Sequence, residues 1–174
     1  MKKSNIVLIG MPGCGKSTCG VLLAKIALMD FVDTDLLIQQ KEGVRLQNII
    51  DEKGIEKFIE IENGVLSSLN VENTIISTGG SAIYSEEGMN HLKENGIVLY
   101  IKIDLQTVVE RIKDFSMRGI VIRKGDTLED LLKERAPLYE KYADIVVKST
   151  SADASENVEK MISAIKEYRL SNNI

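Results

Sequence analysis

The feature that most constrains this chain is a glycine-rich stretch near its N-terminus, Gly10-Met11-Pro12-Gly13-Cys14-Gly15-Lys16-Ser17. It satisfies the pattern GxxxxGK[ST] and lies between a short apolar run, Asn5 to Ile9, and a segment of helical period. Glycines let a backbone wrap around a polyphosphate with its N–H groups pointing inward, and the positive end of a following helix adds to the attraction. The sequence therefore predicts a strand, a phosphate-binding loop and a helix that together bind a nucleoside triphosphate, with ATP as the expected ligand.

The polar residues of this loop have separate expected roles. Lys16 would reach the β and γ phosphates, and the Ser17 hydroxyl would coordinate the Mg²⁺ that accompanies ATP. The alternative is a glycine-rich turn without a ligand, but a chance match in a chain of this length is rarer than about one in a hundred. The ATP-binding residues predicted from the loop are Gly10, Gly13, Cys14, Gly15, Lys16, Ser17 and Thr18.

The rest of the chain alternates short β-branched runs with longer segments of helical period. With 174 residues, 44% of them hydrophobic, there is room for one domain, residues 1–174. The alternation predicts a three-layer α/β protein, in which helices cover both faces of a parallel sheet of about five strands. We expect strands at 5–9, 31–33, 74–77, 97–103 and 144–147, and helices at 15–28, 46–69 (broken near Gly54), 85–94, 105–113, 128–142 and 155–170.

Charge and composition exclude several classes of partner. The net charge of −4 argues against nucleic acid, and the apolar runs are far shorter than the roughly 20 residues of a membrane span. No signal-peptide pattern precedes the first strand, so we expect a cytoplasmic protein and a monomer that binds small molecules. Cys14 and Cys19 form no disulfide framework, and the absence of CxxC and HExxH patterns argues against zinc.

A phosphate-binding loop alone does not identify a reaction, because kinases, GTPases and motor ATPases share it. The chain has no NKxD tetrapeptide, the usual mark of guanine specificity, and it is shorter than most motor ATPases. A small kinase that uses Mg²⁺ with ATP is therefore the expected class. A catalytically weak nucleotide-binding regulator remains the alternative from outside that class.

Two aspartates, Asp33 and Asp35, end the second predicted strand. Their period of two places both on one side, facing the mouth of the sheet where the phosphates would lie. Asp35 has an alternative role as the cap of a helix that begins near Leu36, a role that would leave Asp33 unexplained. Asp104, which follows the strand at 97–103, is expected to cap the next helix rather than to bind metal.

With these features the chain resembles the shikimate kinase family, small P-loop enzymes that move the γ phosphate of ATP to the 3-hydroxyl of shikimate. The resemblance covers nearly the whole chain and implies a three-layer P-loop kinase fold and phosphorylation of a small cyclic hydroxy acid. It is carried by the P-loop, Asp33-Thr34-Asp35, Phe58 with Glu62, Thr78-Gly79-Gly80, Arg118, and Arg135-Ala136-Pro137-Leu138-Tyr139 leading to Ala143-Asp144.

The resemblance also implies roles for residues on the acceptor side, in a region of about 33–62 and beyond. Asp33 would support the Mg²⁺ shell with Ser17, and Asp35 would hold the acceptor hydroxyl and receive its proton. Gly79 and Gly80 would present their backbone to the acceptor. Arg135 would bind its carboxylate.

A loop at about 114–126 is expected to act as a mobile lid, since it has two glycines, three positive residues and weak periodicity. By the resemblance, Arg118 in this lid would meet the transferring phosphate and Arg111 would pack against adenine. The implied catalytic residues are therefore Lys16, Asp35 and Arg118.

The chain departs from the family pattern at three positions. Ile59 stands where the FRxxE segment has an arginine, Ser81 replaces a third glycine, and Gly119 follows the lid arginine in place of proline. One hydrogen-bonded charged contact contributes roughly 1.5–3 kcal/mol, so losing one would weaken a carboxylate acceptor by about 10- to 150-fold unless another cation compensates. Arg45, Lys57 and Arg123 are candidates for that role. A kinase for a different polyhydroxylated metabolite is the alternative within the class.

Overall fold

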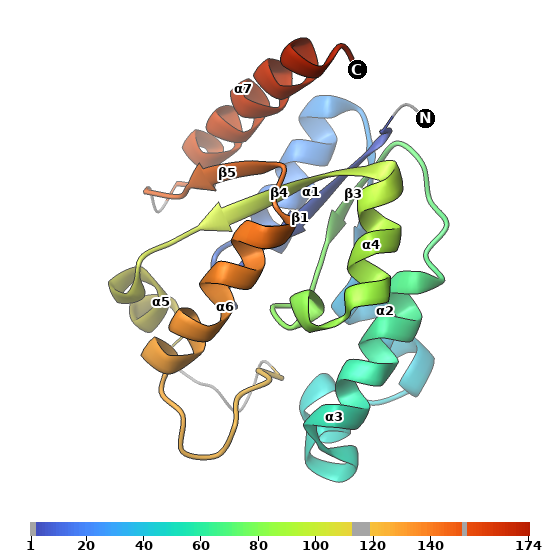
Figure 1. Cartoon of the computed structure of the whole chain (residues 1–174), viewed down its shortest axis with the longest axis vertical. Coiled ribbons are helices and arrows are strands. Elements are labelled where there is room, and N and C mark those ends of the chain that lie inside the picture. The colour runs from blue at the N-terminus through green and yellow to red at the C-terminus, as the bar shows by residue number, and fades with distance from the viewer. Residues whose placement is uncertain (1–2, 113–118, 151–152) are drawn as a thin grey trace.

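A parallel five-stranded sheet forms the centre of the molecule, in a computed structural model that describes residues 3–112, 119–150 and 153–174. The strands lie in the order β2-β3-β1-β4-β5, and helices cover both faces, as the sequence predicts (Figure 1). In chain order the elements are β1 (Asn5–Ile9), α1 (Lys16–Ala27), β2 (Asp30–Asp33), α2 (Thr34–Glu42), α3 (Leu46–Ser67), β3 (Thr74–Ser77), a 3₁₀ turn η1 (Ala82–Tyr84), α4 (Glu86–Asn95), β4 (Gly96–Lys102), α5 (Leu105–Arg111), α6 (Leu128–Tyr142), β5 (Ile145–Lys148) and α7 (Ala154–Asn172).

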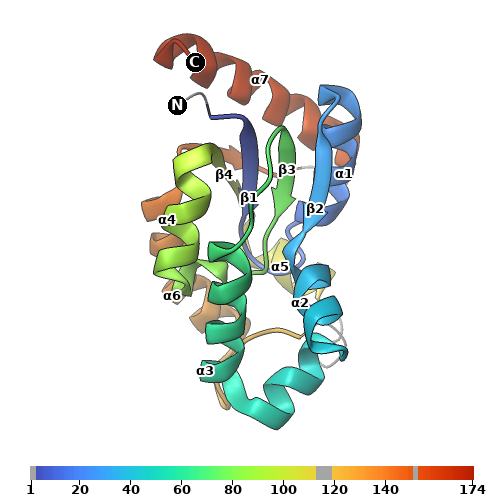
Figure 2. The same cartoon turned by 90° about the vertical axis from the view of Figure 1, so that its right-hand side faces the viewer.

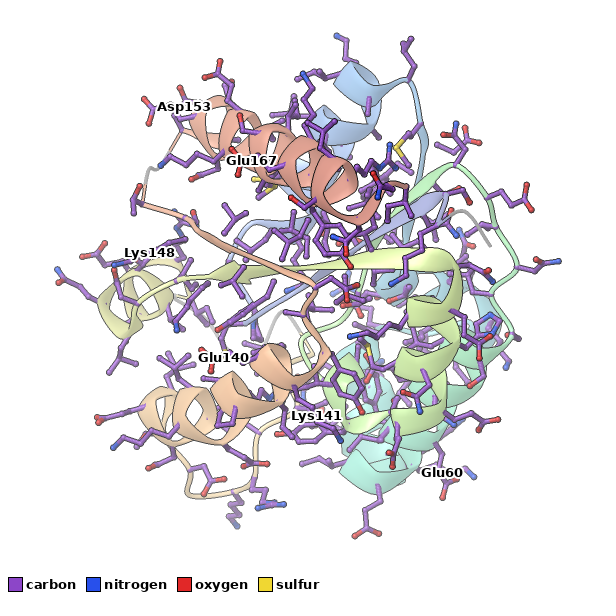
Figure 3. All side chains as sticks on the ribbon, turned by 45° about the horizontal axis from the view of Figure 1, so that its top comes forward. Glu60, Glu140, Lys141, Lys148, Asp153 and Glu167 are labelled. Atoms are coloured by element: carbon purple, nitrogen blue, oxygen red, sulfur yellow. The ribbon has the colours of Figure 1, made fainter. Side chains whose placement is uncertain are left out.

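The two central strands explain why the sheet is easy to find in the sequence. Every residue of β1 is buried, and so are the first six residues of β4, because helices cover both faces of a parallel sheet. Val7 of β1 is paired with Ile76 of β3 on one side and with Val98 of β4 on the other. The edge strand β5 instead alternates buried and exposed residues. Its exposed Lys148 is labelled in Figure 3.

The helices form the two outer layers. Figure 2 shows α1 on one side of the sheet and α4 with α6 on the other, while α7 packs against α1 and β5. The charged residues labelled on α3, α6 and α7, among them Glu60, Glu140 and Glu167, are exposed on the outer sides of these helices (Figure 3). Within the described ranges, no helix is both long enough and apolar enough to cross a membrane.

The ends of the helices confirm some expectations and correct one. The break predicted near Gly54 is present in α3, where this glycine has a φ of 82° and a ψ of 166°. Asp104 caps α5 by accepting a hydrogen bond from the backbone N–H of Thr107, as predicted. The alternative in which Asp35 caps a helix near Leu36 is wrong, because α2 begins at Thr34 and Asp33 is its N-cap.

The helices α2 and α3 extend beyond the carboxyl ends of the strands (Figure 2). The loops that follow β1, β2 and β3 end at this same edge of the sheet because the strands are parallel. In open α/β sheets ligands bind outside the carboxyl ends of the strands. The fold therefore brings the P-loop, the Asp33-Thr34-Asp35 segment and the Thr78-Gly79-Gly80 segment to one place.

Candidate active site

A cavity of about 530 Å³ opens at the carboxyl end of the sheet. The P-loop and the start of α1 form one part of its wall, and the loop after β3, α6 and residues 119–121 form another. Gly10 and Asp33 are not among the lining residues, and Arg118 lies outside the described residues together with positions 114–117 of the expected lid. The predicted site residues that line the cavity are Gly13, Cys14, Gly15, Lys16, Ser17, Thr18, Asp35, Gly79, Gly80, Arg111 and Arg135.

The P-loop has a backbone that only glycine adopts easily. Gly10, Gly13 and Gly15 all have positive φ, and a Cβ at Gly10 would lie 2.7 Å from the carbonyl oxygen of Ile101. The Lys16 ammonium donates to the carbonyl oxygens of Gly10 at 2.7 Å and of Met11 at 3.0 Å. Lys16 is therefore held within the loop that would surround a phosphate.

Ser17 and Asp33 meet although 16 residues separate them. The Ser17 hydroxyl donates to Asp33 Oδ2 at 2.6 Å, and the hydroxyl oxygen of Ser77 lies 3.2 Å from that of Ser17. Asp33 Oδ1 accepts the capping hydrogen bond from the N–H of Asp35. The described chain has no group of three or more His, Cys, Asp or Glu side chains suited to a metal. A carboxylate with a hydroxyl still fits Mg²⁺, which usually keeps waters and binds phosphate oxygens as its other ligands.

Asp35 is half-buried at the cavity wall. Its pKa is raised to about 6, chiefly by burial and next by the charge of the nearby Asp33, while the Lys16 ammonium acts in the opposite direction. Asp35 is therefore mostly ionised at neutral pH while its pKa lies close to that pH. A group of this kind is suited to receive a proton from an alcohol.

Glu62 lies behind this wall and is fully buried. Burial raises its pKa to about 8, so the carboxyl is mostly uncharged at neutral pH. Gly79 lies between the two acidic groups: a Cβ at this position would collide with Glu62 Oε1 and would lie 2.7 Å from Asp35 Oδ1. The glycine therefore allows the loop after β3 to pack directly against both carboxyl groups.

Arg135 of α6 has no exposed surface, yet one of its nitrogens has no hydrogen-bond partner in the described chain. Nη2 donates to the carbonyl oxygen of Val121, and Nε donates to the Tyr84 hydroxyl at 3.3 Å. The remaining nitrogen, Nη1, would lie 3.1 Å from a Cβ at Gly80. Buried polar groups are almost always paired, so an unpaired guanidinium nitrogen beside a cavity suits an anionic ligand.

Sequence reasoning missed the residues that hold Arg135 and the glycine loop. Tyr84 and Val121 belong to no motif, and their contacts with Arg135 join parts of the chain 51 and 14 residues apart. Tyr139 was part of the family resemblance but had no stated role. Its hydroxyl donates to the carbonyl oxygen of Gly80 at 2.7 Å, and its ring stacks on Tyr100.

The departures from the family pattern have different positions in the structure. Ser81 lines the cavity, whereas Ile59 is half-buried and is not among the described residues of the lining. None of the three candidate replacements for the missing arginine lines the cavity in the described chain. Lys57 is paired with Glu60, Arg123 lies 3.9 Å from Glu134, and Arg45 is exposed at the start of α3.

Residues of α5 and α7 also contribute to the lining of the cavity. Arg111 Nη1 donates to the carbonyl oxygen of Cys14 at 3.5 Å, which brings this side chain to the outside of the P-loop. Ala154 and Asn157, at the start of α7, also line the cavity and were not predicted from the sequence.

Comparison with known proteins gives one consistent result. Residues 12–166 match the family model described as shikimate kinase. The chain is 35% identical to a shikimate kinase of a Sulfurihydrogenibium strain, over 93% of this chain and 98% of that protein, and 36% identical to one of Pasteurella multocida, over 94% and 96%. Among solved structures, shikimate kinase from Acinetobacter baumannii in complex with shikimate has a TM-score of 0.87 and 30% identity, and the match covers 96% of this chain and 95% of that one.

Proposed function

This chain belongs to the shikimate kinase family, and from that premise we propose that it transfers the γ-phosphoryl group of ATP to a ring hydroxyl of shikimate. The observation that carries the proposal is the pair of Asp35 and Arg135 on one cavity wall. One is a carboxylate with a pKa near neutrality, and the other has an unpaired guanidinium nitrogen beside Gly80. In a hydroxy acid, the hydroxyl group would be the partner of Asp35 and the carboxylate the partner of Arg135.

On the nucleotide side, the P-loop residues would bind ATP. Lys16 would exchange its hydrogen bonds to the carbonyls of Gly10 and Met11 for bonds to the β and γ phosphates. The N–H groups of the loop and the start of α1 would bind the remaining phosphate oxygens. Arg111 would lie against adenine, next to the start of α7.

Ser17 and Asp33 would hold Mg²⁺, since their oxygens already lie 2.6 Å apart. When bound, Mg²⁺ neutralises phosphate charge. Ser17 would then orient the bound nucleotide, and Asp33 would keep its second oxygen on the N–H of Asp35. Asp33 thereby fixes the start of α2 and the position of Asp35.

On the acceptor side, Arg135 would bind the carboxylate and the backbone of Gly79 and Gly80 would contact the ring. Asp35 would hold the reacting hydroxyl. As the hydroxyl oxygen forms its bond to the γ phosphorus, the bond from that phosphorus to the bridging oxygen breaks, and the hydroxyl proton passes to Asp35. Arg118 is the lid residue expected to stabilise the transferred group.

Initial rates of ADP formation with shikimate, quinate, gluconate and no acceptor test the proposal. We expect shikimate to give the highest kcat/KM, with little ADP formed in its absence. Asp35→Asn should retain ATP binding and lose phosphoryl transfer, because the amide does not accept the proton. A higher kcat/KM for another acceptor would favour the alternative, a kinase for a different polyhydroxylated metabolite. A rate of ADP formation that is the same with and without an acceptor would contradict the proposal.

A further inference from the structure

Ser81 connects the cavity with the buried carboxyl group behind it. The residue is buried, with 4% of its surface exposed, and it lines the same cavity as Asp35, Gly80 and Arg135. Its side chain lies close enough to Glu62 to act on that carboxyl and lower its pKa. Ser81 is therefore the residue through which the lining of the cavity adjoins Glu62.

Glu62 has few other partners. Both of its carboxyl oxygens are inaccessible to solvent, and neither has a hydrogen bond of good geometry to a described residue. Three ionisable groups face it: Asp35 from α2, which raises the pKa of Glu62, and Arg135 from α6 and Lys16 from α1, which lower it. Burial is the strongest influence and keeps the carboxyl uncharged at neutral pH.

An uncharged carboxyl changes what the neighbouring hydroxyl can do. A carboxylic acid has one O–H donor, and a serine hydroxyl has one donor and two acceptor lone pairs. When Glu62 donates to Ser81, the Ser81 hydrogen is left to be donated elsewhere, and the cavity is the open side. An ionised Glu62 would instead accept that hydrogen and withdraw it from the cavity.

We propose that Ser81 determines acceptor specificity by binding a ring hydroxyl of the acceptor, and that Glu62 positions the Ser81 hydroxyl from behind the cavity wall. The inference rests on the proposed function, since it adds a third contact to the site in which Asp35 holds the reacting hydroxyl and Arg135 the carboxylate. A neutral hydroxyl is the matching partner for Ser81. The favoured acceptors are thus cyclic acids with a further hydroxyl beside the one that is phosphorylated.

The first test compares shikimate with analogues that each lack one ring hydroxyl. Ser81→Ala should raise KM for shikimate by about 3- to 10-fold, the effect of one neutral hydrogen bond, and should leave kcat within about 2-fold. The same variant should leave KM unchanged for the analogue that lacks the partner hydroxyl. Ser81→Gly removes the same hydroxyl and should give the same pattern of KM values. It replaces Ser81→Ala in the test if the alanine variant folds poorly. The matched control is Ser85→Ala, a buried serine outside the cavity lining, which should change neither parameter.

The second test addresses the positioning role of Glu62. Glu62→Gln is neutral at every pH and retains one donor group and one acceptor group, so its KM should stay near the wild-type value at pH 7. Above about pH 8 the wild-type KM should rise as Glu62 ionises, whereas the KM of the variant should stay flat. If Glu62 only filled space, the dependence of KM on pH would be the same for the wild type and for Glu62→Gln.

The outcomes separate the two proposals. Wild-type protein that forms no ADP in response to shikimate would overturn the proposed function, and the inference with it. Active wild-type protein with an unchanged KM in Ser81→Ala, or with the same rise for every analogue, would overturn the inference alone. Parallel KM profiles for wild type and Glu62→Gln would remove the positioning role of Glu62.

Discussion

Replacing Gly79 by alanine should lower kcat by about 100-fold in a protein that still folds. The φ of Gly79 is not positive, so the backbone accepts an alanine and only the added methyl group matters. That methyl group would collide with Glu62 Oε1 and would lie 2.7 Å from Asp35 Oδ1. Glu62 is fully buried, whereas Asp35 lines the cavity, so Asp35 is the side chain with room to move.

The expected size of the effect follows from that displacement. Asp35 Oδ1 must move by about 0.7 Å to reach an ordinary contact distance of 3.4 Å. A displacement on the order of 1 Å at a reacting group costs about 100-fold in rate. Overpacking of one methyl group costs about 1–3 kcal/mol of stability. We therefore expect kcat to fall by about 100-fold in a protein that still folds.

The assay is the initial rate of ADP formation at saturating ATP and shikimate, with urea denaturation to measure stability. The matched control is Gly64→Ala in α3, where no atom lies within 4 Å of the added Cβ. This helical substitution should stabilise the protein by about 0.5–1 kcal/mol and leave kcat unchanged. A folded Gly79→Ala variant with kcat within about 3-fold of the wild type would show that Asp35 does not act where the structure has it.

Three further predictions concern single side chains. Lys16→Ala should reduce turnover by at least about 100-fold while the protein remains folded by circular dichroism, because the lysine neutralises phosphate charge; near-normal activity would contradict the P-loop assignment. Glu62→Gln should change how stability depends on pH: the folded-state pKa of about 8 exceeds the ordinary value of 4.5, so wild-type stability falls as the pH rises from about 4.5 to 8. In urea denaturation the variant should match the wild type near pH 4.5 and exceed it by on the order of 4 kcal/mol at pH 8, and parallel curves would argue against a buried neutral acid. Ile59 is not among the described residues that line the cavity, so Ile59→Arg tests whether a longer side chain from this position reaches the acceptor: if it does, KM for shikimate should fall by roughly 10-fold, because a guanidinium pairs a carboxylate bidentately, and an unchanged KM would show that it does not.

The sheet could be predicted closely because burial on both faces leaves a clear mark in the sequence. The strands β1 and β4 are almost continuous apolar runs, and β1 and β3 have the predicted bounds. The start of α2 was less clear, since Thr34 and Asp35 begin the helix without an apolar repeat and Asp33 acts as its cap. The local signal of two nearby carboxylates did not distinguish the capping residue from its neighbour.

The candidate site was only partly predictable, for a physical reason. The P-loop and the aspartates are local motifs whose chemistry can be inferred from residue types and spacing. The environment of Arg135 depends instead on Tyr84 and Val121, and the contact of Ser81 with Glu62 joins a loop to a distant helix. Such contacts are set by packing, and no spacing in the sequence encodes them.

The most direct test of the account is ³¹P NMR of a reaction that contains wild-type protein, Mg²⁺, ATP and shikimate. The account predicts a phosphomonoester signal that grows in step with ADP, and no such signal with Asp35→Asn. ADP that accumulates with inorganic phosphate alone, or no consumption of ATP when shikimate is added, would contradict the claim that this chain phosphorylates shikimate.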